Sequence, residues 1–360
     1  MHTHARYTSV IVSAAFVIVA ALGIADVRPS HAQTQQGESE RSAGKIVVAN
    51  RAAGTISVID AERARLIRNI ALPAASRPPE PMYVVNTTSF GGDRIWVGDR
   101  ANNRVVVFDS DSFDVVDNIP TGAGVFHMWA DPHGRQLWVV NDVDRTATVV
   151  DIRTMSVAAT VHMPADLVAA GARPHDVVLD EHGRSAYVTV TGSGLSSDMI
   201  VRFDTSSFRE RARAAVGRDP HVSYNRKTDQ IFSPNQLTNN VYVLDGDDLS
   251  VADVIAIPAA HGAATSHNAH WFFATNISGG GTNAVYAIDT RTRSIAAVAS
   301  TAFPTPHNLA LTPNGKMLYV THSGATNDRV SVMEVDSHGQ MRLVGDIVTG
   351  ANPFGLAYVR

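Results

Sequence analysis

The sequence has 360 residues, a formal net charge of −4 and no cysteine. The absence of cysteine excludes disulfides, thiolate metal sites, covalently attached c-type haem and a cysteine nucleophile, so any chemistry must use other side chains. The mildly acidic balance argues against nucleic acid as a partner, because nucleic-acid affinity rests on Lys and Arg facing phosphates.

Residues 1–32 have the pattern of a secretory signal peptide. A basic end up to Arg6 is followed by an apolar run over residues 10–24 and by the small-x-small sequence Ser30-His31-Ala32. The apolar run is shorter than the roughly 20 residues that a spanning helix needs. We therefore expect cleavage, with an uncleaved anchor as the alternative, and a periplasmic or secreted protein without a stable membrane span. Residues 33–43 are polar, lack apolar periodicity and are expected to form a flexible leader.

From residue 44 onward the sequence repeats one unit seven times. Each unit contains a β-branched run ending in Asp, which recurs as ISVID (56–60), VVVFD (105–109), TATVVD (146–151), IVRFD (200–204), VYVLD (241–245), VYAID (285–289) and VMEVD (332–336). A run rich in aromatic and β-branched residues precedes each copy, and further apolar runs complete four strands per unit. Without helical spacing between them, these units predict an all-β, seven-bladed β-propeller of four-stranded antiparallel blades over residues 44–360.

The two ends of this repeat complement each other. The first unit begins at Gly44 directly with its second strand, and PFGLAYVR (353–360) has the pattern of the missing first strand. We expect this C-terminal strand to complete the first blade, because pairing the two ends closes the ring and leaves no open edges. A parallel βαβ architecture is the rival, but no amphipathic helical segment separates the strands.

Segments such as LYVTH (318–322), AYVTV (186–190) and FFATN (272–276) resemble the repeats of the YVTN-repeat (YncE-like) β-propeller family. The likeness extends over residues 44–360 and implies the fold rather than a function. Its broader relatives include lactonase-type propellers and the propeller domains of nitrous oxide reductase and of haem-containing nitrite reductase. The resemblance to nitrous oxide reductase implies copper held by histidines at the channel mouth, although the sequence has no counterpart of that enzyme's cupredoxin-like domain or cysteines.

Histidines recur at the start of the first strand in successive units. In PHNLALTPNGKMLYVTH (306–322), His307 opens one strand and His322 ends the next, so antiparallel pairing places both on one face of the propeller. Three of these histidines lie twelve residues before the aromatic residue of the following strand, namely His175, His261 and His307. His127 and His221 lie eleven residues before it. A slip of one residue reverses a side chain on a strand, so a bulge or a shortened strand is needed to align these two.

Imidazoles converging on a narrow axis favour a transition metal, and without thiolates they favour Cu or Zn over Mg or Ca. The predicted metal ligands are His175, His261, His307 and His322, with His127 and His221 assisting. The alternative is that repeat duplication copied a histidine that merely bonds to a neighbouring loop. Four other histidines fall in hairpin turns and are expected to be solvated, namely His133, His182, His267 and His338.

Three classes of function remain open on this evidence. The first is a propeller that binds a metal ion or a small molecule in its central channel. The second is an enzyme that uses the same channel, either a copper or haem oxidoreductase or a lactonase-type hydrolase, for which Arg173 is the one nearby arginine that the pattern indicates. The third is a non-catalytic scaffold whose face binds another envelope protein. The sequence does not decide whether the protein is an enzyme.

Overall fold

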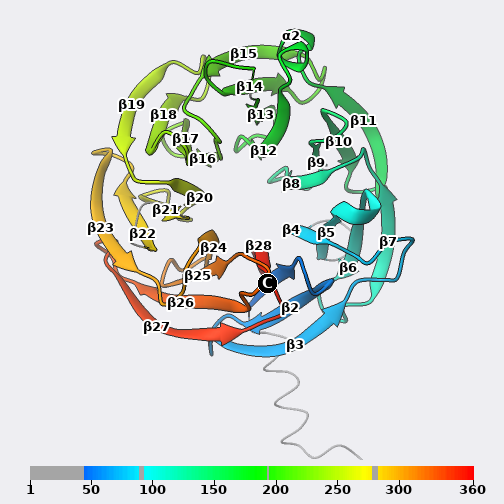
Figure 1. The fold of residues 1–360 in the computed structure, drawn as a ribbon, viewed down its shortest axis with the longest axis vertical. Coiled ribbons are helices and arrows are strands. Elements are labelled where there is room, and N and C mark those ends of the chain that lie inside the picture. Colours follow the sequence, from blue (N-terminus) through cyan, green and yellow to red (C-terminus); the bar gives the residue numbers. More distant parts are fainter. Residues whose placement is uncertain (1–43, 89–92, 193, 278–282) are drawn as a thin grey trace, which may run out of the picture. The chain divides into compact units, whose positions relative to one another are not determined.

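The computed structural model describes residues 44–88, 93–192, 194–277 and 283–360. These residues form a ring of seven four-stranded antiparallel sheets around a central axis (Figure 1). The predicted signal peptide (1–32) and leader (33–43) lie outside the described residues. Within the described ranges, no helix has the length and apolar character needed to cross a membrane.

In each sheet the strand nearest the axis is followed outward by three further strands (Figure 1). The innermost strands are β4 (Pro81–Thr87), β8 (Val125–Ala130), β12 (Arg173–Leu179), β16 (Ser223–Asn225), β20 (Ala260–Thr265), β24 (Pro306–Leu311) and β28 (Pro353–Val359). The second strands are β1 (Lys45–Asn50), β5 (Arg94–Asp99), β9 (Gln136–Asn141), β13 (Ser185–Thr191), β17 (Gln230–Asn235), β21 (Trp271–Asn276) and β25 (Met317–His322).

The third strands coincide with the predicted runs and end at the Asp or, in β26, one residue before it. They are β2 (Thr55–Asp60), β6 (Arg104–Asp109), β10 (Thr146–Asp151), β14 (Met199–Asp204), β18 (Asn240–Asp245), β22 (Ala284–Asp289) and β26 (Arg329–Val335). The outermost strands are β3 (Arg65–Ala71), β7 (Val115–Pro120), β11 (Ser156–His162), β15 (Glu210–Ala215), β19 (Val251–Ala256), β23 (Ser294–Ser300) and β27 (Met341–Val348). A short 3-10 turn η1 (Arg100–Asn102) follows β5, and the helix α2 (Ala165–Ala169) precedes β12.

The C-terminal strand closes the ring as predicted. Strand β28 pairs antiparallel with β1, with Val359 opposite Lys45 and Pro353 opposite Asn50, and so completes the sheet that continues into β2 and β3. The seven-bladed fold and its closure are therefore confirmed.

The hydrophobic core lies between neighbouring sheets. Every residue of β1 is buried, whereas β3 at the outer edge is mostly exposed. A second strand packs against the sheets on both of its sides, so both of its faces need apolar residues. This packing explains why the second strands appear in the sequence as continuous apolar runs rather than as alternating ones.

Tyr319 links the last sheet to the first one. Its buried hydroxyl donates a hydrogen bond of 3.0 Å to the carbonyl oxygen of Ala61 in the neighbouring sheet. We expect Tyr319→Phe to lower the free energy of unfolding by about 1–3 kcal/mol, because the buried carbonyl loses its partner. The control is Tyr286→Phe, whose hydroxyl makes no hydrogen bond within the described residues and whose change should stay below about 0.5 kcal/mol. Urea unfolding of both variants checks this, and equal stabilities would contradict it.

Candidate metal centre

One extra residue bends the start of most innermost strands. In β12, Pro174 pairs with Val190 and Val177 pairs with Val188, so His175 and Asp176 together occupy the space of one residue. The same register shift occurs in β4, β8, β20, β24 and β28. A bulge of this kind turns two successive side chains toward the axis side of the strand instead of alternating them.

The sheet formed by β16–β19 lacks this extra residue. Pro220 bridges to Asn235 and Ser223 pairs with Phe232 without any change of register. His221 therefore occupies alone the space that a bulge gives to two residues, and this shortening explains its spacing of eleven residues to Phe232. His127 has the same spacing for a different reason, because it is the second residue of its bulge, after Phe126.

His127, His175 and His221 come together at the axis from three successive sheets. Each offers one ring nitrogen, and these three nitrogens lie within 4.8 Å of one another. Nε2 of His175 lies 3.2 Å from Nε2 of His221. His127 and His221 are buried, and His175 is the member with partial access to solvent. We call these three residues the imidazole cluster.

Asp176 contacts two members of the imidazole cluster. Its Oδ1 lies 3.0 Å from Nδ1 of His127, and its Oδ2 accepts a hydrogen bond of 3.2 Å from Nδ1 of His221. Burial raises the pKa of the Asp176 carboxyl, but the contacts with His127 and His221 outweigh burial and hold this pKa well below its usual range. The charged carboxylate orients both rings so that Nε2 of each is the nitrogen left for a metal.

Burial favours the neutral form of two imidazoles of the cluster, His127 and His175. Burial lowers the pKa of His127, and it lowers the pKa of His175 still further with the help of the neighbouring His221 and His127 rings. Neither ring nitrogen of His127 has a hydrogen-bond partner with acceptable geometry among the described residues, although Nδ1 lies close to Asp176. Neutral imidazole is the form that binds metals, through the lone pair of its unprotonated nitrogen.

His261 and His307 continue the row of imidazoles beyond the cluster. The ring centroids of His221 and His261 are 3.9 Å apart, and those of His261 and His307 are 4.7 Å apart. Both ring nitrogens of His261 are buried without a hydrogen-bond partner in the described part of the chain. Nδ1 of His307 lies 2.9 Å from Nδ2 of the Asn308 side chain, so this ring nitrogen is already engaged. Burial lowers the pKa of both rings well below the usual value for histidine.

His322 lies opposite Pro306 at the same end of the hairpin as His307, as the antiparallel pairing predicts. Its side chain nevertheless does not join the cluster. Nδ1 lies 2.9 Å from the carbonyl oxygen of Pro304, and Nε2 lies 2.8 Å from the hydroxyl oxygen of Ser331. Both ring nitrogens are therefore used within the sheet, and we correct the prediction by leaving His322 out of the candidate site.

The histidines predicted to be solvated are all exposed in turns, namely His133, His182, His267 and His338. Arg173 is also exposed, and its charge helps to lower the pKa of His175. Sequence reasoning missed Asp176, although it directly follows His175 in the PHD segment. On a regular strand the side chains of His175 and Asp176 would point to opposite faces, and the bulge brings both to the same face.

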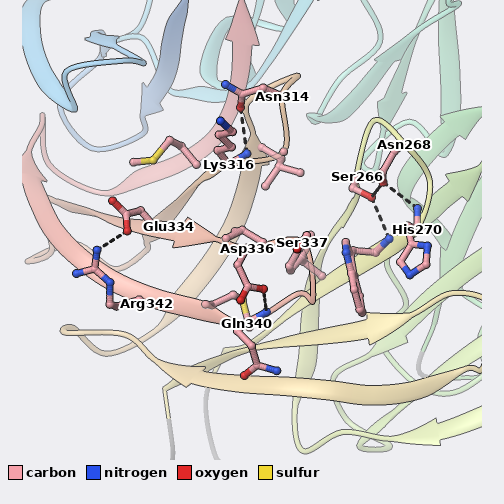
Figure 2. Close-up of a pocket in the computed structure, with 17 residues that line it drawn as sticks. Ser266, Asn268, His270, Asn314, Lys316, Glu334, Asp336, Ser337, Gln340 and Arg342 are labelled. Carbon is pink, nitrogen blue, oxygen red and sulfur yellow. Dashed lines mark hydrogen bonds and ion pairs between the residues drawn. The ribbon is translucent and has the colours of Figure 1, made fainter.

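A hollow of about 810 Å³ lies away from the axis, between the sheet β20–β23 and the sheet β24–β27. Figure 2 shows that its polar groups pair with one another, as in the ion pair of Glu334 with Arg342. The side-chain oxygen of Asn314 accepts a hydrogen bond of 3.0 Å from the backbone N–H of Lys316 (Figure 2). Among the described residues the grouping of three metal ligands lies at the axis and not in this hollow, so the axial cluster is the stronger candidate.

No family model and no curated protein matches this chain. Solved structures do match. The periplasmic gluconolactonase of Pseudomonas aeruginosa is 16% identical with a TM-score of 0.68, over 89% of this chain and 99% of that chain. A putative 6-phosphogluconolactonase from Bacteroides fragilis is 15% identical with a TM-score of 0.67, over 89% of this chain and 98% of that chain.

The hydrazine synthase of Kuenenia stuttgartiensis is also similar, at 16% identity and a TM-score of 0.66, over 77% of this chain and 89% of that chain. The chain has the fold of these propellers. At such identities the likeness establishes the seven-bladed architecture and carries no activity with it.

Proposed function

We propose that this protein is a periplasmic or secreted β-propeller that binds Cu or Zn through His127, His175 and His221. The main support is the distance of 3.2 Å between Nε2 of His175 and Nε2 of His221. Two nitrogen ligands bound at 2.0–2.1 Å to a tetrahedral metal lie about 3.3 Å apart. The pair therefore already has the separation that one shared metal ion requires, and in the metal-free protein the same distance fits a shared proton.

The donor set supports the choice of metal. Neutral imidazoles suit Cu and Zn, whereas Mg and Ca prefer oxygen ligands. Asp176 stands behind two of the imidazoles in the manner of the carboxylate–histidine–metal arrangement that fixes ring orientation. His261 lies beside His221, and its ring nitrogens have no hydrogen-bond partner among the residues that the structure describes, so it is included as a supporting ligand. Three protein ligands with an open position are typical of sites that also bind a substrate or water.

The remaining parts of the proposal rest on sequence patterns. The signal-peptide pattern of residues 1–32 supports export, and the YVTN-like segments support a relationship with YncE-like propellers. Neither pattern bears on the identity of the metal.

The metal content of the protein tests this proposal. Untagged protein purified from the periplasm is expected to contain about one equivalent of Cu or Zn by mass spectrometry of the metal. The double variant His175→Ala, His221→Ala is expected to retain less than about a tenth of that amount, while the exposed control His338→Ala retains all of it. Protein that stays metal-free after incubation with Cu or Zn salts would overturn the proposal.

A metal-independent hydrolase is the second candidate, favoured by the row of contacts from Asp176 to His175. Asp176 accepts a hydrogen bond from Nδ1 of His221, whose Nε2 faces Nε2 of the partly exposed His175. Such a row lets His175 act as a general base toward a bound substrate. Lactone hydrolysis that persists in EDTA and disappears in His175→Ala would favour this candidate over metal binding.

A further inference from the structure

A cavity of about 410 Å³ lies on the axis next to the imidazole cluster. Its wall is built from the innermost strands, mainly from residues that follow the bulges. Asp176 and His221 belong to this wall and also to the candidate metal centre. A molecule in the cavity would therefore lie against the same two side chains that support the metal.

The wall of this cavity combines aromatic surface with a single carboxylate. Four aromatic side chains line it, namely Tyr83, Trp129, Tyr224 and Tyr358. Trp129 is 39% exposed, which is unusual for an indole ring and leaves its face open to a ligand. Among the described residues that line the cavity there is no Lys or Arg, and Asp176 is the one acidic residue.

An unpaired acceptor also belongs to this wall. Oδ1 of Asn86 is buried and has no hydrogen-bond partner within the residues that the structure describes. A buried acceptor without a partner costs about 1–3 kcal/mol, and a donor on a bound molecule removes that cost. The cavity therefore offers an acceptor and a negative charge, and the ligand that complements it carries hydrogen-bond donors.

We propose that this cavity binds a small organic ammonium ion with an apolar, preferably aromatic, body. The Asp176 carboxylate attracts the positive charge through the poorly polarisable wall, and the faces of the tyrosine and tryptophan rings add cation–π attraction. Because the carboxylate already accepts hydrogen bonds from His221 and from the backbone N–H groups of Val177 and Val222, it acts mainly through its field. Asn86 is the acceptor available to the ammonium group.

The same electrostatics disfavour anions such as phosphorylated or carboxylated sugars in this cavity. A second hollow adjoins this cavity and is lined by both Arg360 and Asp131. The two opposite charges there do not favour a cation over an anion. The proposed ligand class adds to the proposed function. It rests on that function only where it places the ligand next to a bound metal ion. Ligand binding is expected in the metal-free protein and is expected to be weaker when the metal is bound.

Calorimetric titration with three probes of similar size tests the inference. They are 2-phenylethylamine, 2-phenylethanol and phenylacetate, which differ mainly in charge. The cation is expected to bind about tenfold more tightly than the alcohol, and the alcohol about tenfold more tightly than the anion, as a single carboxylate at short range predicts. The order is expected for EDTA-treated protein, because a Cu or Zn ion bound beside Asp176 adds positive charge and weakens the preference for the cation. Equal or tighter binding of phenylacetate, or no binding of any probe at about 10 mM, would overturn the inference.

Variants that fill the cavity locate the binding site. Ala264→Phe places a ring in the cavity and is expected to weaken 2-phenylethylamine binding more than about tenfold, whereas Ala252→Phe on the exposed face of β19 should leave it unchanged. Trp129→Ala at a partly exposed position gives a second variant that preserves the fold. Unchanged affinity in both Ala264→Phe and Trp129→Ala contradicts the assignment.

The metal content of Ala264→Phe separates this inference from the proposed function. Full metal content with lost amine binding supports both statements. If the natural chain binds 2-phenylethylamine but takes up neither Cu nor Zn, the cavity inference is supported and the metal proposal is refuted.

Discussion

Replacing His221 by alanine is expected to weaken Cu or Zn binding more than about 100-fold. Loss of a partner that only orients a ligand costs about 10–100-fold in metal affinity, and His221 is itself a ligand in the proposed site. Its Nε2 lies 3.2 Å from that of His175, and its Nδ1 is held by Asp176. Its removal takes away the ring that links Asp176 to His175 and so breaks the site at its centre. Competition titration against a chromogenic chelator measures the affinity.

Asp176→Asn separates the ligands from the residue that positions them. We expect metal affinity to fall about 10–100-fold, because the amide keeps the shape of the side chain but loses the charge that faces His127 and His221. The exposed His182→Ala serves as the control with unchanged affinity. If both Asp176→Asn and His221→Ala bound metal as tightly as the natural chain, the imidazole cluster would have no role in metal binding.

Metal-free protein is expected to lose stability steeply as the pH falls below about 6.5. Three imidazoles near the axis have a pKa well below the usual histidine value in the folded state, mainly because they are removed from water, namely His175, His261 and His307. In the unfolded chain they titrate near 6.5. Below that pH the unfolded state binds more protons than the folded state, so stability is complete above pH 6.5 and is lost as the pH falls toward the folded pKa values.

The size of this effect follows from the linkage relation. Each such histidine lowers the free energy of unfolding by about 1.4 kcal/mol per pH unit once the unfolded chain is protonated, and three of them give about 4 kcal/mol per pH unit. That is a large part of a typical stability of about 5–15 kcal/mol. The Asp176 carboxyl does not contribute in this window, because its lowered pKa costs stability only below the usual carboxyl range near 3.9.

Urea unfolding of the metal-free protein between pH 7.5 and 5.5 measures this slope. The variant His261→Gln should lose about 1.4 kcal/mol per pH unit of the slope, because it removes one buried titrating ring. The variant His338→Gln, in an exposed turn, should keep the full slope. A stability that does not change over this range would show that these three rings are protonated in the folded protein without cost, and would contradict the inference that burial keeps them neutral.

The fold was predictable from the sequence because its repeat is carried by strands that are buried on both faces. The runs ending at Asp60 and Asp109, for example, coincide with the ends of β2 and β6. The closure was predictable because 353–360 has the pattern of the innermost strand that the first unit lacks. Both features depend on local residue patterns that a single sequence contains.

The site was less predictable because side-chain direction depends on register. The bulge at His175 and Asp176 brings a carboxylate beside the imidazoles, and its absence at His221 brings that ring into the same group. A count along the sequence cannot distinguish a bulged strand from a regular one. His322 shows the opposite failure, because it lies at the predicted end of its strand but turns toward Ser331 within its own sheet.

Crystallography of protein soaked with Zn or Cu salt, with diffraction measured on both sides of the metal's absorption edge, tests the central claim most directly. The account predicts one anomalous peak at the axis, within about 2.0–2.2 Å of a ring nitrogen of His127, His175 and His221. A metal bound only at exposed turn histidines such as His133 or His182, with the imidazole cluster unchanged, would contradict it.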